Sequence, residues 1–426
     1  MDLLKKNNLS IRHIAVIILF SLLFATYINT FITSYTSTKM TDSISYHLND
    51  GWCEPKSQGF GEHCFGDYYA PLKYANSESP WSGFISNYPP FSFVILKPFA
   101  YLHDYQSGRA SLIAYLFFTV CCLLFPVFHM RLKHSINSLK FLALFGVSII
   151  SGPIITVIDR GNVLAIAFPF IYLYFYEVGE KNFRKAIIYA TVFVLIKPQL
   201  VILSLILLAL RRYREALTLY LAAGAGTLVS FAFYPSNFFE NIATWFQSTI
   251  NYQSIGAIGV LEPVNVSVKS SVDIIFNIFG AQFNQNLLSW SINLIAIYFI
   301  FQFFIKFSLR KFSHNVMILI LFPILFMGTT YHYYLILLIV PLIIFFNEDE
   351  PKVKTKYSRR INLVYCVLFV TTLTPFALPW GLTGRFNGRG WENISATWLF
   401  AQIILTLGGI YLNQVSESKA KSMQVT

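Results

Sequence analysis

Long apolar segments alternate with short polar or charged ones along almost the whole chain. The segments that we expect to cross a membrane are, in order, residues 14–32, 111–130, 139–157, 163–176, 186–196, 200–210, 216–233, 287–304, 316–327, 334–346, 361–378 and 394–412. About 20 apolar residues span a bilayer core, and shorter segments are tolerated inside a bundle or beside a water-filled cavity. The pattern predicts an all-α fold, a polytopic transmembrane helical bundle with about 12 crossings.

Three stretches depart from this alternation of spans and short loops. Residues 34–88 and 234–286 are predicted outer-face loops, the second with two weakly amphipathic pieces around residues 238–250 and 268–279. Between the first loop and the next span lies NYPPFSFVILKPFAYL, whose apolar part is too short to cross. Pro89 and Pro90 suit a helix start, whereas Lys97 and Pro98 are expected to interrupt it. This stretch is predicted to be a short juxtamembrane helix.

Composition and charge set the class and the orientation. Hydrophobic residues make up 55% of the 426 residues and charged residues only 12%, which excludes an ordinary soluble fold. The net charge of +12 comes with no nucleic-acid-binding module, and most Lys and Arg lie between apolar runs. Basic loops stay in the cytoplasm, so both termini are predicted to be cytoplasmic and the run 14–32 to be an uncleaved anchor. Residues 1–412 are predicted to form a single transmembrane domain, and residues 413–426 a disordered tail.

Cysteine usage and motif searches narrow the chemistry. Cys53 and Cys64 share the first outer loop, where an oxidising compartment favours a disulfide between them. The other three cysteines, Cys121, Cys122 and Cys366, lie in predicted spans as packing residues. No Cys/His set has zinc-ligand spacing, and no glycine-rich phosphate loop or Gly-x-Ser-x-Gly elbow appears. The sequence indicates neither a metal nor another cofactor.

Polar and ionisable residues collect at one predicted membrane face. They are Asp42, Asp159, Arg160, Asn162, Lys197, Gln199, His332, Arg385 and Arg389. Ionisable groups at membrane depth are costly, so their gathering on one side indicates a cavity. A carboxylate there can deprotonate a hydroxyl while the cations hold a departing phosphate. That is the chemistry of transferring a sugar from a lipid phosphate.

The order of four motifs resembles that of type C (GT-C fold) integral membrane glycosyltransferases. The motifs are an early outer-loop Asp42, the Tyr-Pro-Pro start of a short helix at Tyr88, the Arg-Gly-Asn turn from Arg160 and the Lys-Pro pair at Lys197. The pattern is similar to the polyprenyl-phosphate-mannose-dependent mannosyltransferase family and, for the Arg-Gly-Asn turn, to the catalytic subunit of the first GPI mannosyltransferase. The similarity covers roughly residues 12–233, with a weaker match at GTTYHYY, residues 328–334.

The resemblance implies roles for matching residues. Asp42 corresponds to a general base that acts on the acceptor hydroxyl, with inversion at the sugar C1. Lys197 corresponds to a contact of the donor phosphate, and Pro198 would break the helix there. Arg160 and His332 are further candidate phosphate ligands.

Several assignments stay open on the residues alone. Asp67 and Asp159 compete with Asp42 as the base, and Arg160 either binds phosphate or pairs with Asp159. Lys197 has the alternative of a lysine that extends to the interface. The candidate substrate-binding residues are Asn162, Gln199, Asp159, Tyr88, Arg385 and Arg389, of which Tyr88 would shape the cavity rim and the two arginines would equally suit lipid headgroups.

The implied partners are a polyprenyl-phosphate sugar donor, carrying mannose or another hexose, a glycan or glycolipid acceptor, and membrane lipids, but no nucleic acid. The implied location is a bacterial inner membrane, with the active site facing the periplasm or exterior. Bacterial relatives often have Gly-Gln-x-Asn in place of Arg-Gly-Asn, and two histidines where His332 stands alone, so the sugar stays open. The rival hypotheses are a polysaccharide polymerase that uses a pyrophosphate lipid and a flippase for a lipid-linked glycan.

Overall fold

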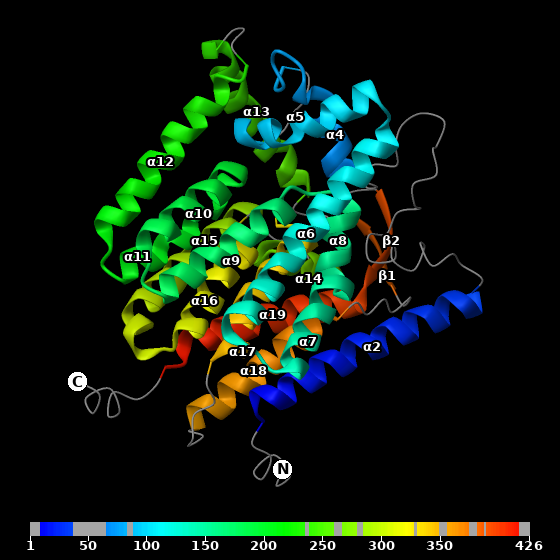
Figure 1. Cartoon of the computed structure of the whole chain (residues 1–426). Coiled ribbons are helices and arrows are strands. Elements are labelled where there is room, and N and C mark those ends of the chain that lie inside the picture. Colours follow the sequence, from blue (N-terminus) through cyan, green and yellow to red (C-terminus); the bar gives the residue numbers. More distant parts are fainter. Residues whose placement is uncertain are drawn as a thin grey trace. The chain divides into compact units, whose positions relative to one another are not determined.

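The computed structural model of the chain describes residues 9–36, 65–82, 88–234, 238–259, 266–278, 284–327, 330–348, 356–374, 381–386 and 389–416 (Figure 1). The chain forms two compact units. The first unit comprises Met1–Asp50, Val127–Ile155 and Val260–Thr426, and the second comprises Gly51–Pro126 and Thr156–Gly259.

The second unit is helical wherever the structure describes regular elements in it. Its elements are α4 (Gly66–Ala75), α5 (Pro90–Tyr105), the first part of α6 (Gly108–His134), the end of α8 (Gly152–Arg160), α9 (Leu164–Gly179), α10 (Phe183–Ile196), the 3₁₀ helix η1 (Pro198–Ser204), α11 (Leu205–Ala209), α12 (Tyr213–Phe231) and α13 (Phe238–Gly259). Helix α9 is buried along nearly its whole length and packs against α10, which in turn packs against α12 (Figure 1). The α9–α10 hairpin is therefore the centre of this unit.

Helix α5 begins as the sequence predicts but does not break where the sequence predicts. Pro90 occupies the first turn, where its missing N–H costs nothing. Lys97 and Pro98, expected to interrupt the helix, lie inside it. Phe93 and Leu96 are buried on the side that packs against the unit, and the Lys97 Nζ donates to the Phe233 carbonyl at 2.9 Å. This burial and the bond to the end of α12 offset the one hydrogen bond lost at Pro98.

The first unit contains the remaining helices and a hairpin. Its elements are α2 (Ile11–Thr36), the end of α6, α7 (Ser138–Ile150), the start of α8, α14 (Val268–Ile278), α15 (Gln285–Lys306), the 3₁₀ helix η2 (Phe307–Leu309), α16 (Phe312–Phe326), the 3₁₀ helix η3 (His332–Leu338), α17 (Ile339–Asn347), α18 (Lys356–Leu373), β1 (Gly381–Phe386), β2 (Arg389–Ser395) and α19 (Ala396–Gln414). Helix α2 packs on α7 and α18, and α16 packs on α17 and α19. Buried Arg310 donates to the carbonyl of Asn413 and so fixes the end of α19.

The predicted all-α, polytopic class is confirmed, since each of the predicted spans contains a helix. Two of the short spans begin as seven-residue 3₁₀ helices, η1 and η3. A 3₁₀ helix rises about 2.0 Å per residue, against 1.5 Å in an α-helix, so each gains about 3–4 Å of length over its seven residues. The predicted outer loop after α18 contains instead the antiparallel pair β1–β2, with Arg385 opposite Gly390.

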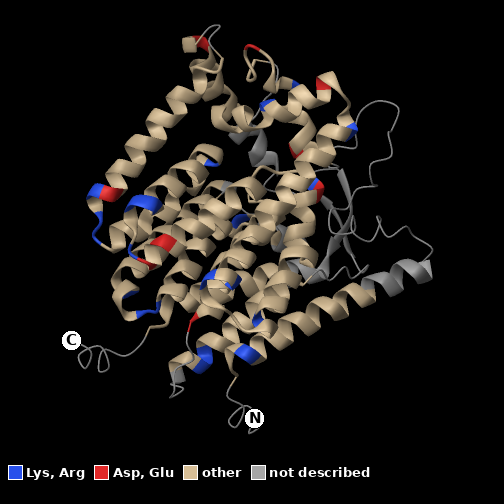
Figure 2. Cartoon of the chain, viewed as in Figure 1, with Lys and Arg blue, Asp and Glu red and all other residues tan. Residues whose placement is uncertain are grey.

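Length and apolar composition identify four helical stretches of the described chain that could cross a membrane. They are Ile11–Ile28, Gly108–His134, Ser138–Arg160 and Asn286–Leu309, and four shorter apolar helical stretches accompany them. In the second unit the charged residues gather at helix ends, notably the turn from α9 to α10 and the start of α12 (Figure 2). Charged ends and apolar bodies are what a bilayer selects. The chain is a membrane protein.

Candidate functional site

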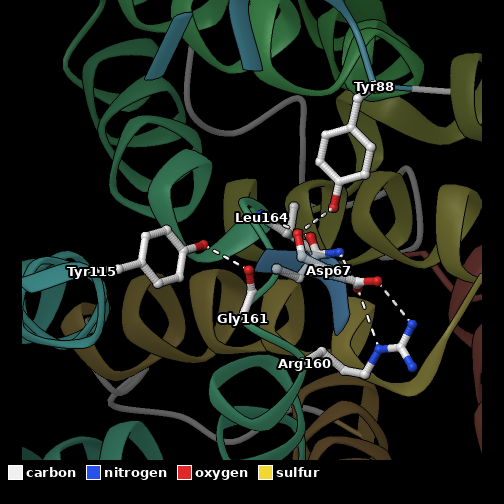
Figure 3. A network of polar contacts seen from close by, with 7 residues as sticks. Asp67, Tyr88, Tyr115, Arg160, Gly161 and Leu164 are labelled. Atoms are coloured by element: carbon white, nitrogen blue, oxygen red, sulfur yellow. Dashed lines mark hydrogen bonds and ion pairs between the residues drawn. The ribbon is translucent and has the colours of Figure 1, made fainter. Parts of the chain in front are cut away.

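The Arg-Gly-Asn turn connects α8 to α9 and leaves no room for a side chain at Gly161. Its φ is +63°, and a Cβ on this residue would lie 2.6 Å from the Cβ of Tyr68. The Tyr115 hydroxyl donates to the Gly161 carbonyl at 2.7 Å (Figure 3). Asn162 follows, and its Oδ1 accepts the Leu164 N–H at 2.9 Å, which caps the first turn of α9. Glycine is therefore required here by conformation and by space.

Asp67, in the first turn of α4, ties this turn to a distant part of the chain. Its carboxylate accepts from Arg160 Nη2 at 2.8 Å and from Arg160 Nε at 3.4 Å, and its Oδ2 also accepts from Asn162 Nδ2 at 2.6 Å (Figure 3). The Phe65 N–H, just before α4, donates to the Asp159 carbonyl at 2.7 Å. The two-point Arg–carboxylate geometry is the strong form of this interaction. Arg160 and Asn162 are thus held by Asp67.

The surroundings of Asp67 keep it ionised. Burial by itself raises the pKa of this carboxyl, but the Arg160 charge and the hydrogen bonds from Arg160 and Asn162 outweigh it, so the net pKa lies below the ordinary 3.8. Both carboxylate oxygens already accept hydrogen bonds. A carboxylate bound in this way is poorly suited to take a proton from a substrate, which weakens Asp67 as a candidate base.

Lys197 ends α10 just before Pro198, as the sequence predicts. Its backbone, at φ −140° and ψ 87°, lies outside the helical region that a following proline disfavours, and Pro198 opens η1. The residue is only 5% exposed, and its ammonium group lies 4.9 Å from the centre of the Tyr88 ring. The structure records no hydrogen bond or ion pair from this ammonium group to any residue that it describes.

The electrostatics link Lys197 to Asp67. Burial lowers the pKa of Lys197 to about 8, although the Asp67 charge acts in the opposite direction. The Lys197 charge in turn helps to lower the pKa of Asp67. The two charges are therefore close enough to interact, but Asp67 is occupied by Arg160 and Asn162. A buried cation in this setting has unused capacity for an anion.

Other predicted residues lie near this centre or elsewhere in the second unit. Asp159 is 4% exposed. The sequence offered an ion pair between Asp159 and Arg160 as one alternative, but Arg160 forms its ion pair with Asp67. Asp159 lies close enough to Arg160 and Asp67 to interact with their charges. Gln199 lies in η1, two residues beyond Lys197. Tyr88 is buried, and its hydroxyl donates to the Asp67 carbonyl oxygen at 3.2 Å (Figure 3).

The remaining candidates belong to the first unit or lie outside the described residues. His332 begins η3 and is buried, and the rings of its sequence neighbours Tyr331 and Tyr333 stack on each other with their centres 5.8 Å apart. Arg385 is in β1, and Arg389 pairs with Phe386 at the start of β2. Asp42 and the predicted disulfide of Cys53 and Cys64 lie outside the described residues. The structure brings together one group of the predicted residues, Arg160, Asn162, Lys197 and Tyr88, around Asp67.

Sequence reasoning missed what positions this group. Asp67 was considered only as a rival base, yet it is the partner of Arg160 across 93 residues of sequence. Ser92 was not singled out, although its Oγ donates to the Ile196 carbonyl at 2.9 Å, immediately before Lys197. Trp81 was also missed, and its Nε1 donates to the Tyr88 carbonyl at 3.1 Å. The one available signal was that Ser92 lies two residues after the Tyr-Pro-Pro motif.

Comparison with known proteins gives one match. The model of a family described as "Glycosyltransferase family 87" matches residues 84–303, which is more than half of the chain. The matched range contains Tyr88, Arg160, Asn162 and Lys197, whereas Asp42, Asp67 and His332 lie outside it. No curated protein and no solved structure matches the chain.

Proposed function

Because the chain belongs to glycosyltransferase family 87, we propose that this membrane glycosyltransferase takes its sugar from a polyprenyl-phosphate-linked donor. The sugar would be mannose or another hexose, and the acceptor a glycan or glycolipid at the outer membrane face. The location that we propose is a bacterial inner membrane, with the active site on the periplasmic or exterior side. Both proposals rest on the positive-inside charge pattern and on the resemblance of the motifs.

The observation that carries the proposal is the environment of Lys197. A charged lysine that is 5% exposed is costly unless an opposite charge or hydrogen-bond acceptors compensate it. Its neighbouring carboxylate, Asp67, is already bound by Arg160 and Asn162. The phosphodiester of a lipid-linked sugar supplies negative charge and acceptor oxygens for the three ammonium donors, and the monoester that leaves carries still more negative charge. The lipid phosphate of a polyprenyl donor is therefore the anion that suits this site inside an apolar helical unit.

The proposed reaction is a single displacement. The carboxylate of Asp42 removes the proton of the acceptor hydroxyl, the acceptor oxygen attacks the sugar C1, and the bond from C1 to the phosphate oxygen breaks. Polyprenyl phosphate leaves with the bonding electron pair, and the Lys197 ammonium group stabilises the negative charge that it gains. The configuration at C1 inverts. No metal is assigned to the reaction.

The other site residues take supporting roles in this proposal. Arg160 uses its Nε and Nη2 on Asp67, so a phosphate contact would require it to share or release that carboxylate. We therefore assign to Arg160 mainly the fixing of the turn, with a phosphate contact as a secondary role. His332 stays a second candidate phosphate ligand, and Asp159 the alternative base.

The test is transfer by the purified full chain in lipid nanodiscs, supplied with radiolabelled polyprenyl-phosphate mannose or glucose and a glycolipid acceptor. We expect one labelled sugar per acceptor in the wild type, and a loss of about 10²–10⁴-fold in D42N at an unchanged unfolding temperature. D50N, which removes a carboxylate from the same loop, is the matched control and should keep its activity.

Three outcomes would redirect the proposal. Unchanged turnover in D42N rejects that residue as the base, and loss in D159N instead would transfer the role to Asp159. A ladder of products from a pyrophosphate-linked repeat unit would show a polymerase. Movement of a lipid-linked glycan across the bilayer without a new glycosidic bond would show a flippase.

A further inference from the structure

Tyr88 is fixed in position at several points. Its hydroxyl donates to the Asp67 carbonyl oxygen at 3.2 Å, and its own carbonyl accepts from Trp81 Nε1 at 3.1 Å. Trp81 is 3% exposed and packs against Phe93, which is fully buried, with ring centres 5.5 Å apart. Pro89 follows directly and Pro90 opens α5, so the backbone after the ring is stiff. Turning the ring of Tyr88 away would break the bond from its hydroxyl to Asp67 and its contact with Phe93.

The lysine that faces this ring is fixed as well. The Ser92 Oγ donates to the Ile196 carbonyl at 2.9 Å, which joins the start of α5 to the end of α10. The Lys197 N–H donates to the Phe193 carbonyl at 2.8 Å, so the Lys197 backbone stays attached to α10. Tyr88 and Lys197 thus come from two elements that a hydrogen bond holds in register. The distance of 4.9 Å from the ammonium group to the ring centre lies within the range of a cation–π contact.

An aromatic ring and a carboxylate would affect the Lys197 ammonium group differently. It stabilises a desolvated cation electrostatically without accepting its hydrogen bonds, so the N–H groups keep their donor capacity. A carboxylate partner would neutralise the lysine and compete with an incoming phosphate. The nearby carboxylate, Asp67, is held by Arg160 and Asn162, and the Tyr88 hydroxyl bonds to the main-chain oxygen of that same residue (Figure 3).

We propose that Tyr88 is a positioning residue for the phosphate of the polyprenyl donor. Its ring stabilises the charged form of the Lys197 ammonium group and keeps it in place without accepting its hydrogen bonds, so that the ammonium group can bind this phosphate. This role differs from the rim-shaping or substrate contact expected from the sequence. It rests on the proposed function, because it assumes that Lys197 binds that phosphate. The ring acts through Lys197 and not on the substrate, which makes the effect of its removal dependent on the lysine.

The experiment measures the dissociation constant of undecaprenyl monophosphate for the full chain in nanodiscs. We expect Y88L to raise this constant about tenfold, Y88F to change it less than about threefold, and Y88W to restore near wild-type binding. In a K197M background Y88L should change the constant less than twofold, because the lysine through which the ring acts is gone. Y88M replaces Y88L should the leucine variant fail to fold.

The control variant is F93L, which removes a ring from the same aromatic cluster but not from the face beneath Lys197. It should lower the unfolding temperature and leave the dissociation constant near that of the wild type. Equal binding by Y88L and the wild type would overturn the inference, as would a Y88L loss that persists in full in the K197M background. A wild type that binds no monophosphate lipid would overturn the inference, because the site would then not hold the phosphate of the leaving group, whereas the transfer assay with the labelled sugar lipid tests the proposed donor separately.

Discussion

Two neighbouring regions of the second unit contain buried charges, and these charges are compensated in one region but not in the other. In one, Asp67 binds Arg160 and Asn162 through three hydrogen bonds, and the opposite charges satisfy each other. In the other, Lys197 is buried at the end of α10 with the face of Tyr88 as its neighbour and no acceptor for its ammonium group in the described chain. We call these the paired cluster and the unpaired lysine.

This difference distinguishes residues that stabilise the fold from residues that can bind a ligand. A paired buried charge has little left to offer a ligand, and removing its partner leaves an uncompensated charge inside the protein. A buried cation without an anion carries a desolvation cost that a ligand can relieve. The paired cluster should therefore control mainly stability, and the unpaired lysine mainly the binding of the donor.

The largest effect is expected at the unpaired lysine. K197M keeps the length and most of the volume of the side chain but removes the charge that would stabilise the departing phosphate. We expect kcat/KM for a polyprenyl-phosphate sugar to fall about 10²–10³-fold, as for the loss of one donor to a developing oxyanion. The unfolding temperature should stay the same or rise, because a desolvated charge disappears. Steady-state transfer and thermal unfolding of the same preparation measure both.

The matched control for K197M is K185M, which removes an exposed lysine from the first turn of α10. It should change neither kcat/KM nor the unfolding temperature appreciably. K197R should recover part of the activity, since it restores the charge with a different geometry. If K197M unfolds at a much lower temperature and transfers normally once folded, Lys197 is structural and the division between the two regions fails.

The next effect is expected in the paired cluster. D67N removes the charge that compensates Arg160, and its amide would present a donor where the carboxylate accepted. We expect a loss of about 2–4 kcal/mol in the free energy of unfolding, since the pair is largely but not fully buried. The folded fraction should still bind a polyprenyl monophosphate within a few-fold of the wild type. Chemical unfolding followed by tryptophan fluorescence measures the first quantity.

The double variant D67N/R160M separates charge from packing. It removes the orphaned guanidinium as well as its partner, so part of the stability lost in D67N should return. If the double variant is as unstable as the sum of the two single losses, the ion pair contributes no coupling and the loss in D67N has another cause. If D67N instead abolishes phosphate binding at full stability, the paired cluster belongs to the binding site.

Local features of this centre could be predicted from the sequence because they depend on neighbouring residues. Proline disfavours a helical conformation in the residue before it, which predicts the end of α10 at Lys197-Pro198. The turn after Arg160 contains glycine because its φ is positive. Most helices followed from apolar segments of sufficient length.

The partners of the charges could not be predicted, because they depend on tertiary packing. Asp159 is adjacent to Arg160 and was the natural partner on the sequence, yet the fold places Asp67 there from 93 residues away. In the same way, nothing local indicates that Ser92 and Trp81 would place the Tyr88 ring beneath Lys197. Pro98 was expected to break α5, and side-chain burial along the helix prevented it. Which charges are paired is a property of the fold.

The smallest expected effect is a pH dependence of the paired cluster. Burial acts to raise the pKa of Asp67, but the Arg160 charge and the two side-chain hydrogen-bond partners bring it below its unfolded value near 3.8. Its ionised form therefore stabilises the fold fully above that value, and this contribution is lost as the pH falls through the lower folded pKa. The difference in unfolding temperature between the wild type and D67N should stay constant from pH 6 to about 4 and narrow as the pH is lowered further, because protonation then leaves the wild type with a neutral side chain as well. E240Q, which removes an exposed carboxylate of α13, should track the wild type in parallel over the whole range. A difference between wild type and D67N that stays constant down to the lowest pH would mean that the bond to Arg160 stabilises by its geometry and not by its charge.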